Sequence, residues 1–200
     1  MNTGFARTRG TLLAWLNADD VYMPGAVSRA VAALQAHPAA ALVYGQADFI
    51  DRRGVRLGPC PQVEPFDLAR LIHQLDFIVQ PATLFRRSAF EAVGGLDATL
   101  RYCLDYDLWI KLALRYPVHY EPAVLACARI YPETDCQRGA GAARRIRRMI
   151  GRYGRRRHAD AIRRDGARLL AGGLARVRRA SGARPARSGG AAQCILGHTC

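Results

Sequence analysis

Long apolar runs are absent from this sequence. No stretch of the 200 residues approaches the roughly 18 uninterrupted apolar positions that cross a bilayer, so we predict no membrane-spanning helix. The run from Thr11 to Leu16 is short, and Asn17-Ala18-Asp19-Asp20 follows it where a secretory signal needs small residues for cleavage. We therefore expect no signal peptide.

Lysine is nearly absent, since Lys111 is the only lysine among 30 basic residues and all the others are arginine. Closely spaced cysteines are also missing. The six cysteines form no C-x-x-C pair and show no metal-ligand spacing. This argues against a zinc site or a disulfide framework, and we expect free thiols in a reducing compartment.

Charge of one sign dominates only the end of the chain. Residues 1–136 carry 13 basic and 14 acidic side chains, whereas residues 137–200 carry 17 arginines and two aspartates. The formal net charge of +14 therefore belongs to the second part. We interpret residues 1–136 as a near-neutral globular domain and residues 137–200 as an arginine-rich tail, partly helical and partly disordered.

The hydrophobic pattern alternates between strand-like and helix-like segments, which predicts an α/β fold. We expect helices at 24–36, 66–75, 88–93 and 105–115, and strands at 11–16, 41–44, 47–50, 55–57, 82–85 and 124–130. The first strand has no polar alternation, which is typical of a buried, parallel strand. With the first helix and the second strand it forms a predicted βαβ unit.

Acidic residues follow the first predicted strand. Asn17, Asp19 and Asp20 stand at its carboxyl end, where open α/β sheets bind their ligands. Two adjacent carboxylates repel each other, and a hard cation such as Mg²⁺ or Mn²⁺ would offset that repulsion. The alternative is that these residues cap the helix that follows.

A second acidic pair, Asp105 and Asp107, begins the last predicted helix. A carboxylate there is favoured by the helix dipole, stays ionised and can accept a proton from an attacking hydroxyl. The alternative is again a helix cap, with Trp109 on the same helix belonging to the core.

Seven short motifs follow one another along the chain: Asn17-Ala18-Asp19-Asp20, Tyr44-Gly45, Ile50-Asp51 with Gly54, Gln80-Pro81-Ala82-Thr83, Phe85-Arg86-Arg87, Val93-Gly94-Gly95-Leu96-Asp97 and Asp105-Tyr106-Asp107-Leu108-Trp109. In this order they resemble family 2 GT-A glycosyltransferases across about residues 2–135. The resemblance implies an incomplete GT-A, Rossmann-like layer followed by the basic tail. It also implies that the usual nucleotide-binding front end is missing, so that the chain is truncated at its N-terminus.

The resemblance implies roles for the acidic residues. Asp20 would bind a divalent Mn²⁺ or Mg²⁺, Asp19 would contact the ribose or the metal, and Asp105 would be the general base. The donor would be a nucleoside-diphosphate sugar and the acceptor a glycan or lipid-linked hydroxyl, with inversion at the anomeric carbon. The remaining substrate-binding candidates are Asn17, Gln80, Asp107, Trp109 and Arg129, although Trp109 in the core and Arg129 in a surface ion pair are alternatives.

Two further alternatives stay open for the function and the tail. The chain could be a catalytically inactive remnant, at most a binding module. The tail could be a solvated segment, an amphipathic helix for an anionic membrane surface, or a binder of nucleic-acid phosphates. Because Tyr153 is the only aromatic residue after Tyr131, we expect no specific nucleic acid partner. The expected location is the cytoplasm or the cytoplasmic face of the membrane.

Overall fold

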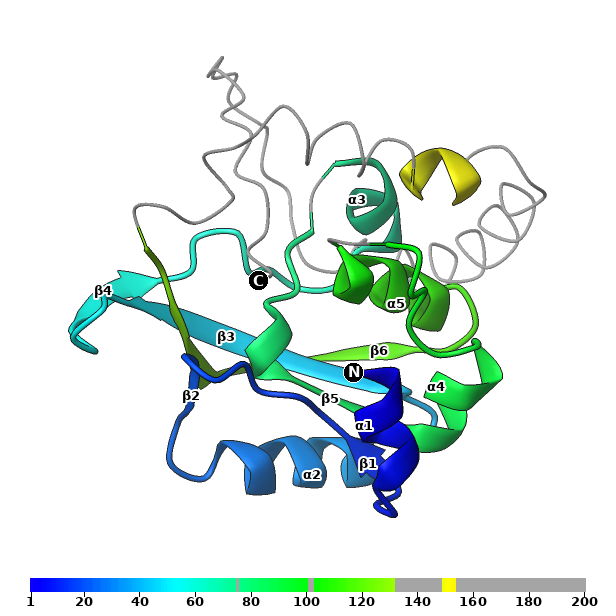
Figure 1. The fold of residues 1–200 in the computed structure, drawn as a ribbon, viewed down its shortest axis with the longest axis horizontal. Helices are drawn as coiled ribbons and strands as arrows, with labels where there is room; N and C mark the ends of the chain where they lie inside the picture. Colours follow the sequence, from blue (N-terminus) through cyan, green and yellow to red (C-terminus); the bar gives the residue numbers. More distant parts are fainter. Residues whose placement is uncertain (75, 101–102, 132–148, 154–200) are drawn as a thin grey trace, which may run out of the picture.

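The computed structural model describes residues 1–74, 76–100, 103–131 and 149–153, and it shows a mixed α/β fold (Figure 1). The elements follow the chain in the order α1 (Asn2–Arg7), β1 (Leu12–Leu13), β2 (Val21–Tyr22), α2 (Ala26–Ala36), β3 (Leu42–Ile50), β4 (Arg56–Pro59), α3 (Leu68–His73), the 3-10 helix η1 (Gln80–Ala82), β5 (Thr83–Arg86), α4 (Arg87–Ala92), α5 (Leu104–Ala113) and β6 (Val118–Arg129). Residues 149–153 are helical, and the rest of the predicted tail lies outside the described residues.

The sheet is organised around β3. The strands lie in the order β1-β5-β3-β6-β2, and β4 pairs with the C-terminal residues of β3, from Asp48 to Ile50. β3 and β6 are parallel over nearly their whole length, from Leu42 opposite Val118 to Ile50 opposite Arg129. β3 pairs antiparallel with β4 and β5, β1 with β5, and β2 with β6. Most of β3 is buried, as expected for a central strand.

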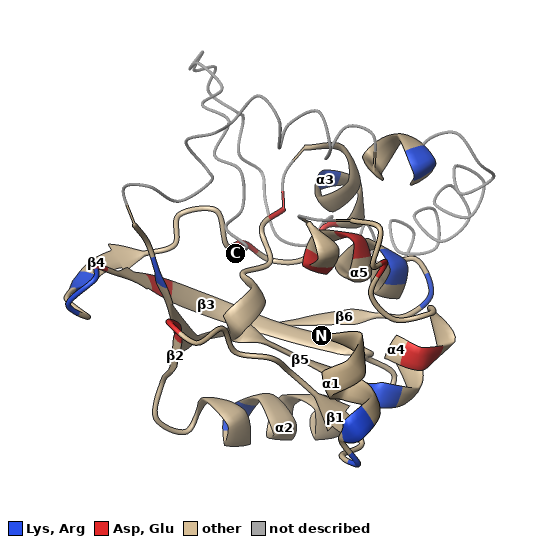
Figure 2. Ribbon diagram, viewed as in Figure 1, with Lys and Arg blue, Asp and Glu red and all other residues tan. Residues whose placement is uncertain are grey.

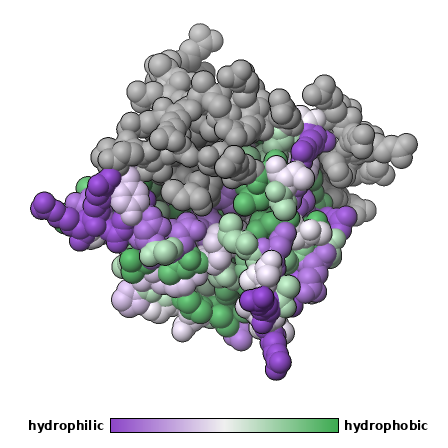
Figure 3. All heavy atoms as spheres, viewed as in Figure 1, coloured by the Kyte–Doolittle hydropathy of each residue, from purple (hydrophilic) through white to green (hydrophobic). Residues whose placement is uncertain are grey.

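Helices cover both faces of the sheet. Figure 1 shows α2 below it and α3 and α5 above it, with α1 and α4 beside one another at one end. Five aromatic rings join these layers by edge-to-face and stacked contacts: Phe5, Trp15, Phe85, Phe90 and Trp109. On the face seen in Figure 3, hydrophilic residues gather at the β3–β4 hairpin and beside α1, with apolar residues between them. Within the described residues, no helix combines the length and the apolar character that a membrane span requires.

Local signals account for most of the elements. The predicted hairpin turn is confirmed, because the Asp51 carboxylate accepts hydrogen bonds from the backbone N–H groups of Arg53 and Val55, each at 2.8 Å. The predicted glycine stop after α4 is confirmed as well. Gly94 and Gly95 adopt left-handed φ angles of 82° and 66°, a conformation in which glycine carries no Cβ penalty.

The pairing of the first strand differs from the prediction. β1 covers only Leu12–Leu13 and runs antiparallel to β5, which lies between β1 and β3. The predicted parallel character was wrong because strand neighbours far along the chain leave no local signal. The sequence also missed β2, which is two residues long, and the first half of β6, whose residues are mostly half-buried.

The β3–β6 pairing leaves no room for a side chain at Gly45, which can be tested by substitution. A Cβ at this position would lie 2.5 Å from Leu125 Cγ and 2.8 Å from the Ala123 carbonyl oxygen, where the register between the two strands shifts. We expect Gly45→Ala to lower the free energy of unfolding by about 1–3 kcal/mol, measured by urea denaturation.

Gly4→Ala is the matched control, because Gly4 lies in α1 and a Cβ there meets nothing within 4 Å. It should raise the free energy of unfolding by about 0.5–1 kcal/mol. Equal stability of Gly45→Ala and the unmodified protein would contradict the close approach of the two strands.

Candidate functional site

The acidic loop between β1 and β2 is held by hydrogen bonds to its own side chains and to β6. The Asp20 N–H donates to the Asn17 carbonyl at 3.2 Å, and the Asn17 side-chain amide donates to Asp20 Oδ2 at 3.0 Å. The backbone N–H of Arg129, at the end of β6, donates to Asp20 Oδ1 at 2.9 Å. Both carboxylate oxygens of Asp20 therefore have a fixed orientation.

The Arg129 side chain fastens the same loop from a second direction. Its Nε donates to the Asp19 carbonyl at 2.9 Å, and its Nη1 donates to the carbonyl of Asp51, which follows β3. The guanidinium thus joins the acidic loop to the carboxyl ends of the two central strands. This is the edge of an α/β sheet at which ligands bind.

Burial makes the Asp20 carboxylate costly to ionise. Loss of contact with water raises the pKa of Asp20, and the neighbouring charge of Asp19 adds to the effect. The hydrogen bonds from Arg129 and Asn17 lower the pKa but do not outweigh burial. A cation beside Asp20 would offset this cost.

The residues of the loop fit a divalent metal. Each Asp20 oxygen accepts one protein hydrogen bond and keeps further acceptor capacity, as carboxylate oxygens have about two sites each. In the part of the chain that the structure describes, His, Cys, Asp and Glu form no group of three that could hold a metal by themselves. A metal here would take its remaining ligands from water and substrate phosphates, as Mg²⁺ commonly does.

Arg52 and Tyr131 also border the loop, and the sequence gave no signal for either. Loss of contact with water and the nearby Asp19 carboxylate raise the pKa of Tyr131, whose hydroxyl also hydrogen-bonds to Asp19. The Arg52 guanidinium carbon lies 5.3 Å from the centroid of the Tyr131 ring, a cation–π distance. Figure 2 shows acidic positions on the ribbon both near β2 and on α5.

The second acidic group lies on α5. Asp105 is 2% exposed, and its Oδ1 accepts a hydrogen bond from the Tyr106 N–H at 2.8 Å. Across from it, burial and repulsion by Asp105 raise the pKa of Asp76 well above its usual range. The two carboxyls therefore lie close enough to repel each other.

The helix-capping alternative is wrong for the acidic loop, whereas Asp105 lies in the first turn of α5 and accepts a backbone N–H there. α2 begins at Ala26, and its cap is Gly25, with no side-chain hydrogen bond. α5 is capped by Cys103, again without a side-chain hydrogen bond. By contrast, Asp67 is a true cap, accepting from the Arg70 N–H at the start of α3. The carboxylates of the acidic loop therefore do not cap α2.

Trp15 connects the two acidic groups. Its carbonyl accepts a hydrogen bond from Gln80 Nε2 at 2.6 Å, and its ring stacks on Trp109 with centroids 5.7 Å apart. Trp15 precedes Asn17 by two residues. Asp105 lies one helical turn before Trp109 and shares its face of α5. Trp15 thus links the start of the acidic loop to α5.

The predicted site residues fall into two sets, and one further residue, Gln80, lies between them. Asn17, Asp19, Asp20 and Arg129 surround the acidic loop, whereas Asp105, Asp107 and Trp109 lie on α5. Trp109 is fully buried, as its core alternative predicted, and Asp107 is 3% exposed and paired with Lys111 at 2.9 Å. Gln80, which is also buried, holds Trp15 between the sets.

Comparison with known proteins gives one family and several relatives. Residues 1–94 match the family described as glycosyl transferase family 2. The chain is 26% identical over 143 residues to an uncharacterized glycosyltransferase of Rickettsia felis, covering 66% of this chain and 23% of that protein. It is 31% identical over 112 residues to the O-antigen biosynthesis protein RfbC of Myxococcus xanthus, covering 56% of this chain and 8% of that protein. The chain thus spans about a quarter or less of the length of these relatives.

Solved structures share the fold. A crystal structure of S. aureus TarS residues 1–349 in complex with UDP matches with a TM-score of 0.54 and 16% identity, covering 74% of this chain and 42% of that one. A structure of S. aureus TarS matches with a TM-score of 0.56 and 16% identity, covering 80% of this chain and 28% of that one. The described residues therefore adopt a GT-A-like arrangement.

The burial of Asp20 predicts a stability difference that depends on pH. Because the pKa of Asp20 is raised in the folded state, the protonated carboxyl contributes to the free energy of unfolding at low pH. This contribution is lost as the pH rises through the folded-state pKa. Asp20→Asn keeps the acceptor oxygen for Arg129 and removes the charge. With a chelator present, the melting temperature of Asp20→Asn minus that of the unmodified protein should increase from pH 4 to pH 8. A difference that stays constant across this range would contradict the assignment.

Proposed function

Residues 1–94 of this chain match the family described as glycosyl transferase family 2, and from this match we propose that the protein is an inverting glycosyltransferase. It moves a sugar from a nucleoside-diphosphate sugar to a hydroxyl acceptor in glycan or polysaccharide biosynthesis. The observation that carries the proposal is the half-buried Asp20 carboxylate, which Arg129 and Asn17 orient at the carboxyl edge of the sheet.

The donor and acceptor classes are supported by the relatives. The TarS structure with the matching fold holds UDP, and the Myxococcus relative is named for O-antigen biosynthesis. We extend to this chain only the shared chemistry, a nucleoside diphosphate that leaves and a sugar hydroxyl that attacks.

Asp20 and Asp19 would hold a divalent metal beside the donor diphosphate. When bound, such an ion supplies Lewis-acid stabilisation of the charge on the departing diphosphate. Asn17 keeps the Asp20 carboxylate in one orientation, and Arg129 keeps the loop at the sheet edge. Its guanidinium donates to backbone carbonyls, so Arg129 acts through the loop.

Asp105 accepts the proton in the transfer step. The acceptor oxygen forms a bond to the anomeric carbon while the bond from that carbon to the diphosphate oxygen breaks, and the diphosphate leaves with the electron pair. The acceptor hydroxyl proton passes to the Asp105 carboxylate, which general-base catalysis requires within hydrogen-bond reach. Attack opposite the leaving group inverts the anomeric configuration. The Trp109 ring stacks on Trp15, and Gln80 donates a hydrogen bond to the Trp15 carbonyl. These two contacts keep α5 next to the segment that leads into the acidic loop.

Nucleotide titration tests the donor site. We expect UDP or GDP with Mn²⁺ to raise the melting temperature. At a nucleotide concentration a hundred times Kd, binding should stabilise the folded state by about 2.7 kcal/mol. Asp20→Asn should lose the metal-dependent part of the rise. Glu91→Gln, which changes an exposed carboxylate on α4, is the control and should keep it. No metal-dependent rise with either nucleotide would favour the inactive alternative.

The Asp105 assignment makes a separate prediction. Asp105→Asn should retain the nucleotide-induced rise in melting temperature and lower kcat for transfer by about a hundredfold or more, because the proton acceptor is gone. Transfer is measured as release of nucleoside diphosphate in the presence of acceptor. Full activity of Asp105→Asn would remove this residue from the reaction.

A further inference from the structure

The only lysine of the chain lies at the centre of a buried polar network on α5. Lys111 Nζ contacts Asp107 Oδ2 at 2.9 Å and donates to the Gly95 carbonyl at 2.6 Å. Asp107 is 4% exposed at its side chain, whereas Lys111 is 20% exposed. An ammonium group can donate in several directions to separate acceptors, which a planar guanidinium does less well. Lysine therefore suits this position in a chain that otherwise uses arginine.

The helical residues 149–153 complete the same network. The Tyr153 hydroxyl donates to Asp107 Oδ1, so the two oxygens of one buried carboxylate bind groups from two different segments. Burial and the Asp107 carboxylate raise the pKa of Tyr153, so the hydroxyl keeps its proton over the physiological range. Met149, in the same turn, is 1% exposed and belongs to the core.

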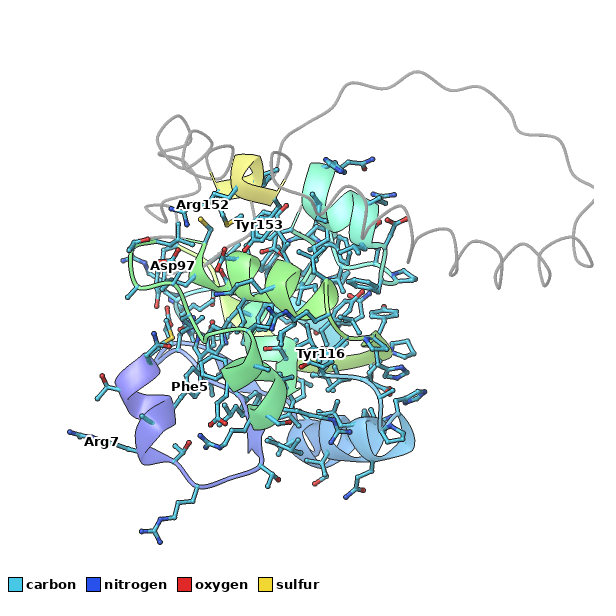
Figure 4. All side chains as sticks on the ribbon, turned by 90° about the vertical axis from the view of Figure 1, so that its right-hand side faces the viewer. Phe5, Arg7, Asp97, Tyr116, Arg152 and Tyr153 are labelled. Atoms are coloured by element: carbon cyan, nitrogen blue, oxygen red, sulfur yellow. The ribbon has the colours of Figure 1, made fainter. Side chains whose placement is uncertain are left out.

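A second ion pair ties this segment to the turn that precedes α5. Arg152 Nη1 contacts Asp97 Oδ2 at 2.7 Å, and Asp97 Oδ1 accepts from the N–H and the hydroxyl of Thr99. Figure 4 shows Arg152, Tyr153 and Asp97 close together at one end of the molecule, with Tyr116 away from them. Three segments thus meet: α5, the turn at 94–97 and residues 149–153.

We propose that residues 149–153 form a clasp that positions α5, and through it Asp105, by way of the Tyr153–Asp107–Lys111 network and the Arg152–Asp97 pair. The clasp rests on the proposed function, because it assigns Tyr153, Asp107 and Lys111 as positioning residues for the base. Asp107 acts through the helix, since its carboxylate is occupied by Lys111 and Tyr153. Residues 149–153 are therefore part of the catalytic unit.

The placement of the network explains why it acts on Asp105. Asp107 is two residues beyond Asp105 in the first turns of α5, and Lys111 is one turn further along. Cys103, just before the helix, has a left-handed φ of 60°, an uncommon conformation for a residue with a Cβ. Asp105 lies between this helix start and Asp107, the residue that the clasp holds.

Hydrogen–deuterium exchange of the full chain tests the clasp without requiring activity. Tyr153→Phe removes one hydroxyl and keeps the ring in the core. We expect roughly tenfold faster amide exchange in α5, as loss of one hydrogen bond to a charged group predicts, with exchange in α2 unchanged. Tyr116→Phe is the matched control, because Tyr116 follows α5 at its other end, and it should leave α5 exchange unaltered. Equal exchange in the two variants would overturn the proposal.

Transfer kinetics separate positioning from a purely structural contact. Tyr153→Phe should lower kcat about tenfold while KM for the donor stays unchanged, because a small displacement of the base affects the chemical step. Arg152→Gln should act in the same direction. Faster exchange in α5 with an unchanged kcat would overturn the positioning role. Absence of transfer by the unmodified chain would count against the proposed function, and the exchange comparison would then decide the clasp alone.

Discussion

The parallel pairing of β3 with β6 is the constraint on which the rest of the structure depends. It fixes both strands in one register from Leu42 and Val118 to Ile50 and Arg129. Because parallel strands end at the same edge, Arg129 and Asp51 lie together there. Arg129 can then reach the carbonyls of Asp19 and Asp51, which are 110 and 78 residues away in sequence. The acidic loop therefore takes its position from the sheet.

The carboxylates of the described residues differ in what neutralises them. Asp107 is paired with Lys111, and Asp48, on β3, is paired with Arg56 at 2.6 Å. Asp20 receives backbone and amide hydrogen bonds, and burial still raises its pKa. A buried charge without a close ion pair is costly, so it is the one that a cation would stabilise.

Asp105, the proton acceptor of the proposed reaction, lies on the other side of this packing. It accepts a hydrogen bond from the Tyr106 N–H, and its charge raises the pKa of Asp76. Since the Trp15–Trp109 stack joins α5 to the segment before the acidic loop, α5 and the acidic loop are parts of one packed unit. Trp15 thus contributes to the site through packing, although it was not among the residues predicted from the sequence.

The sequence predicted the features that depend on local chemistry. Helices α2 and α5, the Asp51 turn and the glycine stop after α4 follow from periodicity and turn residues. The acidic loop followed from its position after an apolar strand, and the order of motifs predicted the match of residues 1–94 to glycosyl transferase family 2. Long-range features were not predictable in this way. The antiparallel partner of β1, the two-residue strand β2 and the role of Arg129 depend on contacts between distant segments. Burial of Asp107 likewise depends on Lys111 and on residues 149–153, which the sequence assigned to a tail.

Paramagnetic broadening by Mn²⁺ tests the central claim most directly, namely that the loop held by Arg129 is the metal and donor site. The measurement is an amide NMR spectrum of the isotope-labelled full chain with UDP, as Mn²⁺ is added. Signals of residues 17–22 and of Arg129 should broaden first and together, because Asp20 is bonded to the Arg129 backbone. Broadening centred on another acidic surface, such as Glu121 beside Arg29, with residues 17–22 unaffected, would contradict the account.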